Sequence, residues 1–434
     1  MADGDDPPPT RLKNPLWIAP FLGRVPVGVQ PQQLSLLGVV ALALFFEEYD
    51  MAMLGMALPQ IAADLNISVE ALPDYLWMIR AGALPAFFLL PYADSIGRRP
   101  VFIAATALMG LFTFLTAFAQ TPIQFMLCQA LTRTFFLTGS AVAFVMIAEE
   151  YPAEHRGWGM GILSALGAVG HGLAAGLYAA IHVLPFGWRA LYAVGIVPLF
   201  LIPMFLKKLP ETDRFTAHSE GDDAAKTAGL IAALQPIIEL ARIHPLRAAV
   251  VAGAGFLASF GTMPSFQFTS YFAQEQLSWT PQDIMMMVIG AGALGIIGNV
   301  VAGRLGDTFG RKPVGFALMS LFPGMSYGFF HSTGWLVGAS FAGLVFCSMG
   351  GRLMLRALST ELFPTAQRGA AGGLYSVLET LGGVTGLFVL ARFAVDETAA
   401  LAGVLPLLAC GMLAAGLTLL ALPETKSREL EDLS

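Results

Sequence analysis

The stretch D-S-I-G-R-R at residues 94–99 lies between two apolar runs, and the same pattern returns as D-T-F-G-R-K at residues 307–312. A second motif, E-x-x-P-x-x-x-R-G, spans residues 149–157 and recurs at 361–369. The interval between the copies is nearly the same for both motifs. Two independent motifs that recur at nearly one period indicate duplication of a large unit. We therefore expect a chain built from two related halves.

The composition indicates a membrane protein. Of the 434 residues, 56% are hydrophobic and only 12% are charged, whereas soluble domains average about 25% charged residues. A spanning helix needs about 20 mostly apolar residues, and twelve runs meet that criterion. They lie near 34–58, 74–93, 100–119, 124–149, 158–184, 189–207, 247–275, 282–303, 313–331, 334–360, 369–391 and 399–421.

These runs predict an all-α, polytopic membrane protein with twelve transmembrane helices in two pseudo-symmetric six-helix bundles. The expected segments are a tail (1–33), a first bundle (34–207), a middle loop (208–246), a second bundle (247–421) and a C-terminal tail (422–434). Lys and Arg gather in both tails, in the middle loop and in the motif loops. Because cytoplasmic loops carry an excess of these residues, we expect both termini to be cytoplasmic, in the cell (inner) membrane.

The duplicated motifs place acids and guanidinium groups at neighbouring helix ends, where Arg binds a carboxylate through a planar fork. We interpret them as a cytoplasmic gate that holds helix ends together in one transport state; the alternative is that the charges only set topology. The gate residues are Asp94, Gly97, Arg98, Arg99, Glu149, Arg156, Asp307, Gly310, Arg311, Glu361 and Arg368.

With these motifs the chain resembles the major facilitator superfamily, and more narrowly its branch of sugar porters and metabolite–proton symporters. P-E-T-D-R-F at 210–215 resembles the PESPR element of that branch, and P-E-T-K at 423–426 resembles its PETK ending. The resemblance implies alternating access to a substrate site near the midplane, and it implies a monomer. The sugar-binding signatures of helices 7 and 10 are missing here: Arg352 and Arg356 stand at two of those positions.

The first predicted helix contains three acids, Glu47, Glu48 and Asp50. Three carboxyls this close cannot all be ionised cheaply in a low-dielectric site, so at least one is expected to exchange a proton. In the resembled symporters the acid of a Tyr-Asp pair couples to protons, and Asp50 matches it, with Arg133 of helix 4 as its expected partner. The alternative is that one acid only neutralises an arginine.

Other polar side chains interrupt the apolar runs. A charge at the bilayer centre costs about 2.5–3.5 kcal/mol on insertion scales, so such residues are functional candidates. We expect them to contact substrate, although each is also compatible with a structural role. They are Arg80, Gln129, His171, Gln267, Tyr271, Asn299, Arg352, Arg356, Tyr375 and Glu379. Arg352 and Arg356 share one helix face and need an anion between them, supplied by Glu361 or by the substrate.

These observations favour a secondary transporter for a small organic anion, driven by protons. A sugar or polyol porter and an efflux antiporter stay open as alternatives, and a membrane receptor or enzyme is a third. The chain has no Walker-type phosphate loop, no metal motif and no catalytic constellation, so we expect no cofactor, no metal and no enzymatic activity. With a net charge of −6 and no basic stripe, nucleic acid is not an expected partner. The expected partners are the substrate, protons and the lipid bilayer.

Overall fold

The computed structural model describes residues 12–18, 24–212, 230–364, 367–393 and 400–424, and helices are the only regular secondary structure in that part. Within helices a few side chains, that of Asp94 among them, lie outside the description. The expected tails at 1–11 and 425–434 and the start of the middle loop at 213–229 also lie outside it. All twelve apolar runs of the sequence form helices, as predicted.

The first half consists of nine helices. They are α1 (Pro31–Met56), α2 (Leu58–Asp64), α3 (Leu72–Ala81), α4 (Ala86–Ile96), α5 (Arg98–Thr116), α6 (Pro122–Glu150), α7 (Ala153–Ala179), α8 (Trp188–Ala193) and α9 (Ile196–Lys208). The middle segment contains α11 (Leu230–Ile243). The second half consists of α12 (Pro245–Leu277), α13 (Pro281–Phe309), α14 (Arg311–His331), α15 (Trp335–Glu361), α16 (Arg368–Arg392) and α17 (Leu401–Leu419).

Nine helical segments in the described part are long and apolar enough to cross a membrane. The other spans are α1, which contains three acids, α14, and the broken pair α3 and α4. Pro begins four of the long helices, at Pro31, Pro122, Pro245 and Pro281. The first turn of a helix suits Pro because its missing N–H would have no intrahelical partner there.

The second predicted helix is interrupted: the run near 74–93 forms α3 and α4 with a break at residues 82–85. Pro85 closes the break, and a Cβ on Gly82 would lie 2.3 Å from the carbonyl oxygen of Ala130 in α6. The hydroxyl of Thr134 donates a hydrogen bond to the Gly82 carbonyl, which the break leaves without a helical partner. The break is therefore packed and hydrogen-bonded against α6.

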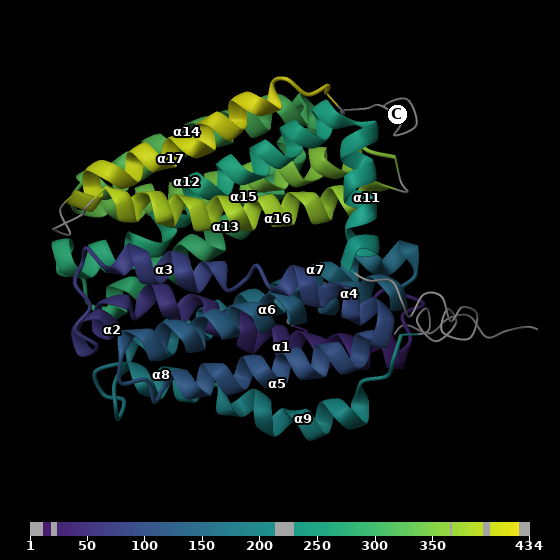
Figure 1. The fold of residues 1–434 in the computed structure, drawn as a ribbon, viewed down its shortest axis with the longest axis horizontal. Helices are drawn as coiled ribbons and strands as arrows, with labels where there is room; N and C mark the ends of the chain where they lie inside the picture. The colour runs from purple at the N-terminus through teal and green to yellow at the C-terminus, as the bar shows by residue number, and fades with distance from the viewer. Residues whose placement is uncertain (1–11, 19–23, 213–229, 365–366, 394–399, 425–434) are drawn as a thin grey trace, which may run out of the picture.

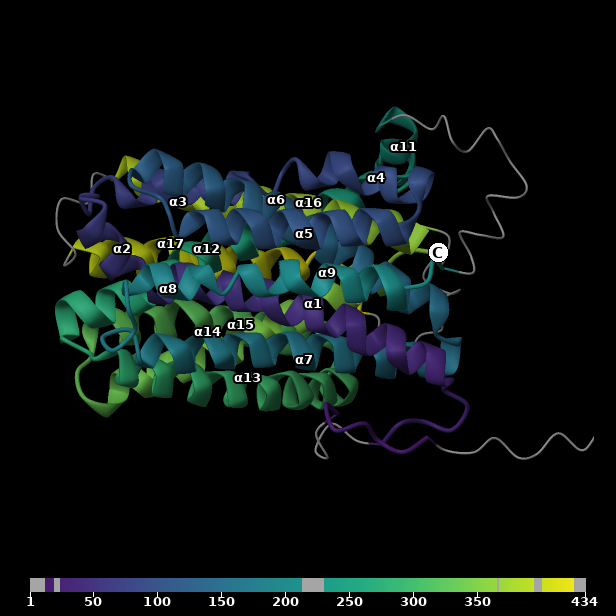
Figure 2. The same ribbon diagram turned by 90° about the horizontal axis from the view of Figure 1, so that it is seen from below.

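The two halves lie side by side, purple-to-teal helices in one layer and green-to-yellow helices in the other (Figure 1). The seam is formed by α3 against α16, α7 against α13, and α1 against α12. Seen from below, the long helices of both halves run in nearly one direction (Figure 2). We call the end with the loops at 97–99 and 310–312 the motif end, and the other the far end.

The halves are tied together by hydrogen bonds at the far end. The Gln274 side chain of α12 accepts from Gln60 of α2 (2.8 Å) and from the hydroxyl of Tyr178 of α7 (2.6 Å), and it donates to the Met56 carbonyl (3.0 Å). Gln282 donates to the Ala179 carbonyl (2.8 Å). These bonds join the two halves directly at the far end.

Candidate functional site

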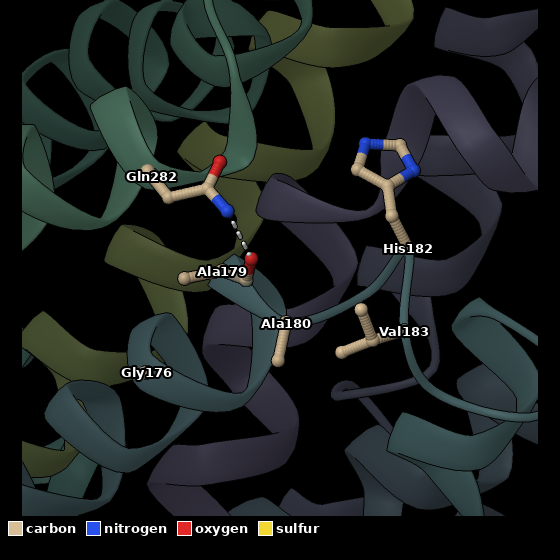
Figure 3. Close-up of a pocket in the computed structure, with 6 residues that line it drawn as sticks. All are labelled: Gly176, Ala179, Ala180, His182, Val183 and Gln282. Atoms are coloured by element: carbon tan, nitrogen blue, oxygen red, sulfur yellow. Dashed lines mark hydrogen bonds between the residues drawn. The ribbon is translucent and has the colours of Figure 1, made fainter.

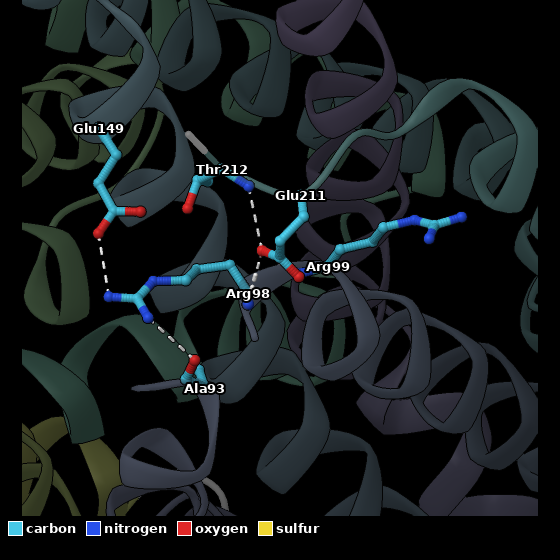
Figure 4. Close-up of polar contacts among 6 residues, drawn as sticks. All are labelled: Ala93, Arg98, Arg99, Glu149, Glu211 and Thr212. Carbon is cyan, nitrogen blue, oxygen red and sulfur yellow. Dashed lines mark hydrogen bonds and ion pairs between the residues drawn. The ribbon is translucent and has the colours of Figure 1, made fainter. Parts of the chain in front are cut away.

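At the motif end of the first half, charged side chains connect three helices (Figure 4). Arg98 forms an ion pair with Glu149 at the end of α6 (3.0 Å) and donates to the Ala93 carbonyl of α4 (3.2 Å). The Glu211 carboxylate, just after α9, accepts hydrogen bonds from the backbone N–H groups of Arg98 (3.0 Å) and Arg99 (3.2 Å). Glu211 thus caps the positive end of α5.

The second half repeats this network. Arg311 pairs with Glu361 at the end of α15 (2.8 Å) and with Asp307 of α13 (2.9 Å). Glu424, after α17, accepts from the backbone N–H groups of Arg311 (2.9 Å) and Lys312 (3.1 Å). Sequence reasoning assigned no role to either capping glutamate. The signal that could have found them was a third repeat, the Pro-Glu-Thr stretch at 210–212 that returns at 423–425.

The turns that allow this capping need glycine. Gly97 has φ 109° and Gly310 has φ 106°, a region that other residues rarely adopt. A Cβ would also lie 2.4 Å from the Glu211 carboxylate at Gly97 and 2.8 Å from that of Glu424 at Gly310. These two predicted gate residues therefore serve the capping turns.

The ion pairs above lie within one half each, where they join neighbouring helices of the same bundle. The remaining predicted gate arginines lie nearby: Arg368 donates to the Phe363 carbonyl (3.3 Å), and Arg156 has a buried Nε without a hydrogen-bond partner in the described part. The Asp94 side chain lies outside the described residues. A gating role for the set stays a prediction.

Inside the first half, a group that we call the N-half cluster surrounds Asp50. The Asp50 side chain is 2% exposed and accepts a hydrogen bond from Thr113 of α5 (3.1 Å). Gln129 and Arg133 of α6 are also buried, and Gln129 donates to Thr116 (3.2 Å). The charges of Asp50 and Arg133 act on each other. Direct contact was expected, but no ion pair within 4.0 Å joins them in the described part.

Tyr192 of α8 belongs to the same cluster and was missed by the sequence. It is 1% exposed, its hydroxyl has no hydrogen-bond partner among the described residues, and it lies within electrostatic range of Asp50 and Arg133. Its sequence context is apolar and gave no signal. The N-half cluster therefore combines a carboxyl, a guanidinium and a phenol with unused hydrogen-bonding capacity.

The two other acids of α1 point in different directions. Glu47 is fully buried, and neither carboxylate oxygen has a hydrogen-bond partner in the described part. It lies against α6, where a Cβ on Gly139 would be 2.7 Å from it. The Glu48 carboxylate instead lies 3.3 Å from Nδ1 of His171 in α7, and both side chains retain accessible surface. The sequence did not predict that pairing, because the two residues lie on separate helices.

In the second half, Glu379 of α16 lies between two arginines of α15; we call Arg352, Arg356, Tyr375 and Glu379 the C-half cluster. Arg352 forms an ion pair with one Glu379 oxygen, and Arg356 lies 3.6 Å from the other. The Arg356 guanidinium is 5.9 Å from the centre of the Tyr375 ring. The anion that the two arginines were predicted to need is thus Glu379, and Glu361 is instead bound to Arg311.

The remaining predicted polar residues lie apart along the second half. Gln267 is at the seam, where a Cβ on Gly55 of α1 would be 3.9 Å from its amide nitrogen. Tyr271 is buried and packs edge-on against Phe268, and Asn299 is half-buried on α13. Gln60, Tyr178 and Gln274, which tie the far end, were not predicted as functional residues.

A pocket of about 310 Å³ lies at the far end, between the end of α7 and the start of α13 (Figure 3). It is lined by Gly176, Ala179, Ala180, His182, Val183 and Gln282. In Figure 3 the Gln282 amide reaches the Ala179 carbonyl beside it. The pocket belongs to the far-end tie and is separate from both charged clusters.

Comparison with known proteins agrees with this architecture. The model of the family described as Major Facilitator Superfamily matches residues 40–273 and 251–433. The sialic acid transporter NanX of Escherichia coli is 25% identical over 360 residues, covering 82% of this chain and 86% of that protein. The cis,cis-muconate transport protein of Acinetobacter baylyi is 24% identical over 373 residues, covering 77% and 82%. The inward-open xylose transporter XylE of E. coli superposes with TM-score 0.71 at 20% identity, covering 92% and 99%.

Proposed function

The chain belongs to the Major Facilitator Superfamily, and from that premise we propose that it is a proton-coupled symporter of small organic anions. It is an integral, multi-pass membrane protein that transports a small molecule, and it is a transporter and not an enzyme. We further propose that it is a monomer in the inner membrane with both termini cytoplasmic. In this proposal the proton gradient is the driving force, and no cofactor is required.

The proposal that the substrate is an anion rests on the charge balance at the seam between the halves. The C-half cluster has an excess of positive charge, because Arg352 and Arg356 share a single carboxylate, that of Glu379. Arg80 lies within electrostatic range and adds to that excess. Excess charge within membrane-spanning helices is costly unless a counter-ion compensates it, and a bound anion would supply that compensation. The relatives named for sialic acid and cis,cis-muconate support this class, since both compounds carry carboxylates.

The N-half cluster supplies the proton site in this proposal. Asp50 lies near Arg133 without a contact within 4.0 Å, so protonation of Asp50 removes a negative charge that partly compensates the arginine. The uncompensated positive charge then attracts an anion into the interior, because electrostatic forces are strong where water is excluded. Loss of the proton reverses this. Proton and anion therefore favour each other's binding, which is the thermodynamic requirement for symport.

Uptake into liposomes tests the proposal. Purified protein should take up cis,cis-muconate or sialic acid faster when the outside is more acidic than the inside. In Asp50→Asn the extra uptake that the proton gradient causes should be about tenfold smaller or absent, while the protein stays folded. Glu275→Gln, an exposed acid on α12, is the matched control and should behave like the wild type.

The pH dependence of anion binding shows whether proton binding and anion binding favour or oppose each other. If a proton binds with the anion, anion affinity should fall as the pH rises, by at most about tenfold per pH unit. Asp50→Asn should make affinity nearly independent of pH. Uptake by the wild type that ignores the proton gradient would contradict the coupling, whereas acceleration that persists in Asp50→Asn would move the proton site to Glu47 or Glu48.

A further inference from the structure

Arg80 lies where the broken helix meets the other half. It occupies the last turn of α3, directly before the break at residues 82–85. The break is held against α6 by the close approach of Gly82 to Ala130 and by the Thr134 hydrogen bond, so the backbone beside Arg80 is well anchored. A discontinuous helix inside the membrane is a place where transporters commonly bind solutes.

The Arg80 side chain reaches from the first half to the second. A Cβ on Gly383 of α16 would lie 3.5 Å from the Arg80 Nε. Within electrostatic range are Glu379 and Arg352 of the C-half cluster and Arg133 of the N-half cluster. Arg80 is thus the arginine that lies between the two clusters, at the α3–α16 seam.

Arg80 differs from the arginines of the C-half cluster in having no ion-pair or hydrogen-bond partner in the described part, a property that it shares with Arg133. The Arg80 Nε is buried without a hydrogen bond, and within the described part no ion pair or hydrogen bond includes its guanidinium. Arg352 and Arg356, in contrast, both bind Glu379. A guanidinium has five N–H donors, so Arg80 retains the full capacity to bind a carboxylate through two parallel hydrogen bonds.

The duplication shows that Arg80 is not part of the shared scaffold. At the interval that relates Asp94 to Asp307, the position equivalent to Arg80 is Ala293, and α13 continues through the region that corresponds to the break. The break and the unpaired arginine therefore occur together, in one half only. A half-buried, unpaired arginine within a membrane span that the scaffold does not require is a candidate functional residue.

We propose that Arg80 is the residue that binds the carboxylate of the transported anion, while Arg352 and Arg356 stay engaged with Glu379. This assignment rests on the proposed function and deepens it, because it names the residue that binds the substrate carboxylate and the half of the protein that contains that residue. Binding at Arg80 would place the substrate carboxylate at the α3–α16 seam, where the halves move relative to each other. Substrate binding would then compensate the charge that otherwise opposes their closure.

Equilibrium binding of radiolabelled cis,cis-muconate and sialic acid to the purified protein tests the assignment. Arg80→Gln should weaken binding of the anion by about 100-fold, because a charge-assisted carboxylate contact is lost. Arg80→Lys keeps the charge but cannot form the two parallel hydrogen bonds, so it should weaken binding by about tenfold. Arg304→Gln, an exposed arginine on α13, is the matched control.

The outcomes distinguish a failure of the proposed function from a failure of the assignment to Arg80. Thermal melting of every variant reports folding, and Arg80→Lys provides a second variant if Arg80→Gln does not fold. If the wild type binds neither anion, the proposed function is overturned, and this assignment with it. If the wild type binds an anion and folded Arg80→Gln binds it within about threefold of the wild type, only the assignment to Arg80 is overturned.

Discussion

The two halves share one scaffold but differ in their interior charges. At the motif end their chemistry nearly matches: an arginine bound to a helix-end glutamate, and a second glutamate capping the next helix. In the interior the equivalence ends. The first helix of the first half contains three acids, whereas α12, which opens the second half, has a single acid near its end, Glu275. The repeated scaffold therefore does not determine the interior charges of either half.

The ion pair of the second half has no counterpart in the first. At the interval that relates Glu149 to Glu361, the positions equivalent to Arg352 and Glu379 are Ser140 and Gly167. Glu47 is left without a partner in the described part, whereas Glu379 has two arginines. The first half therefore presents acids free to change protonation, and the second half presents a cationic group that is already organised.

The largest expected effects come from breaking the shared scaffold. Gly170 of α7 and Gly382 of α16 are equivalent positions of the two halves, and a Cβ on them would lie 2.1 and 2.0 Å from the carbonyl oxygens of Phe45 and Phe256. Gly170→Val and Gly382→Val should each force a helix pair apart and strongly reduce the yield of folded protein in detergent. Gly172→Val, which has open space beside it, is the control. A normal yield from either variant would contradict close packing at that crossing.

A loss of stability of intermediate size should distinguish the interior of the second half from that of the first. Glu379→Gln leaves two arginines without their carboxylate and should destabilise the protein by about 3 kcal/mol. Glu47→Gln neutralises an acid that has no cationic partner in the described part and should cost less than about 1 kcal/mol. Melting temperatures of both variants provide the comparison. Equal losses would show that the two buried acids are equivalent, against the asymmetry described above.

The smallest effects should be the same in both halves. Glu211→Gln and Glu424→Gln each remove the charge that caps α5 or α14, at a cost of about 1 kcal/mol. Because the two sites have matching geometry, the melting temperatures of the two variants should shift by similar amounts. The double variant should show roughly the sum of the two shifts. A large loss from only one of them would reveal that its carboxylate has an additional role.

The fold was accessible from the sequence for a physical reason. A spanning helix needs a long apolar run, and each run therefore marks a helix; the repeated motifs then mark the two halves. The break at residues 82–85 was not predicted, because bilayers tolerate Gly and Pro within an apolar run when neighbouring helices satisfy the freed backbone groups. That satisfaction comes from Thr134, which no local pattern connects to Gly82.

The site was accessible only in part. Acids and arginines within apolar runs could be identified as candidates, since burying them is costly. Their partners could not, because pairing depends on which helices pack together. Arg352 and Arg356 were expected to need an anion, yet Glu379 was not identified as that anion, and Glu48 was not linked to His171. Tyr192 lacked any signal, since a tyrosine in an apolar helix is usually a packing residue.

The single amide of Gln274 bonds to three groups of the opposite half, the Gln60 side chain, the Tyr178 hydroxyl and the Met56 carbonyl. In the proposed transport cycle, opening at the far end would break these three bonds together. Their combined strength would then set how often that end opens. We therefore expect substitutions of Gln274 to change the turnover number more than the selectivity.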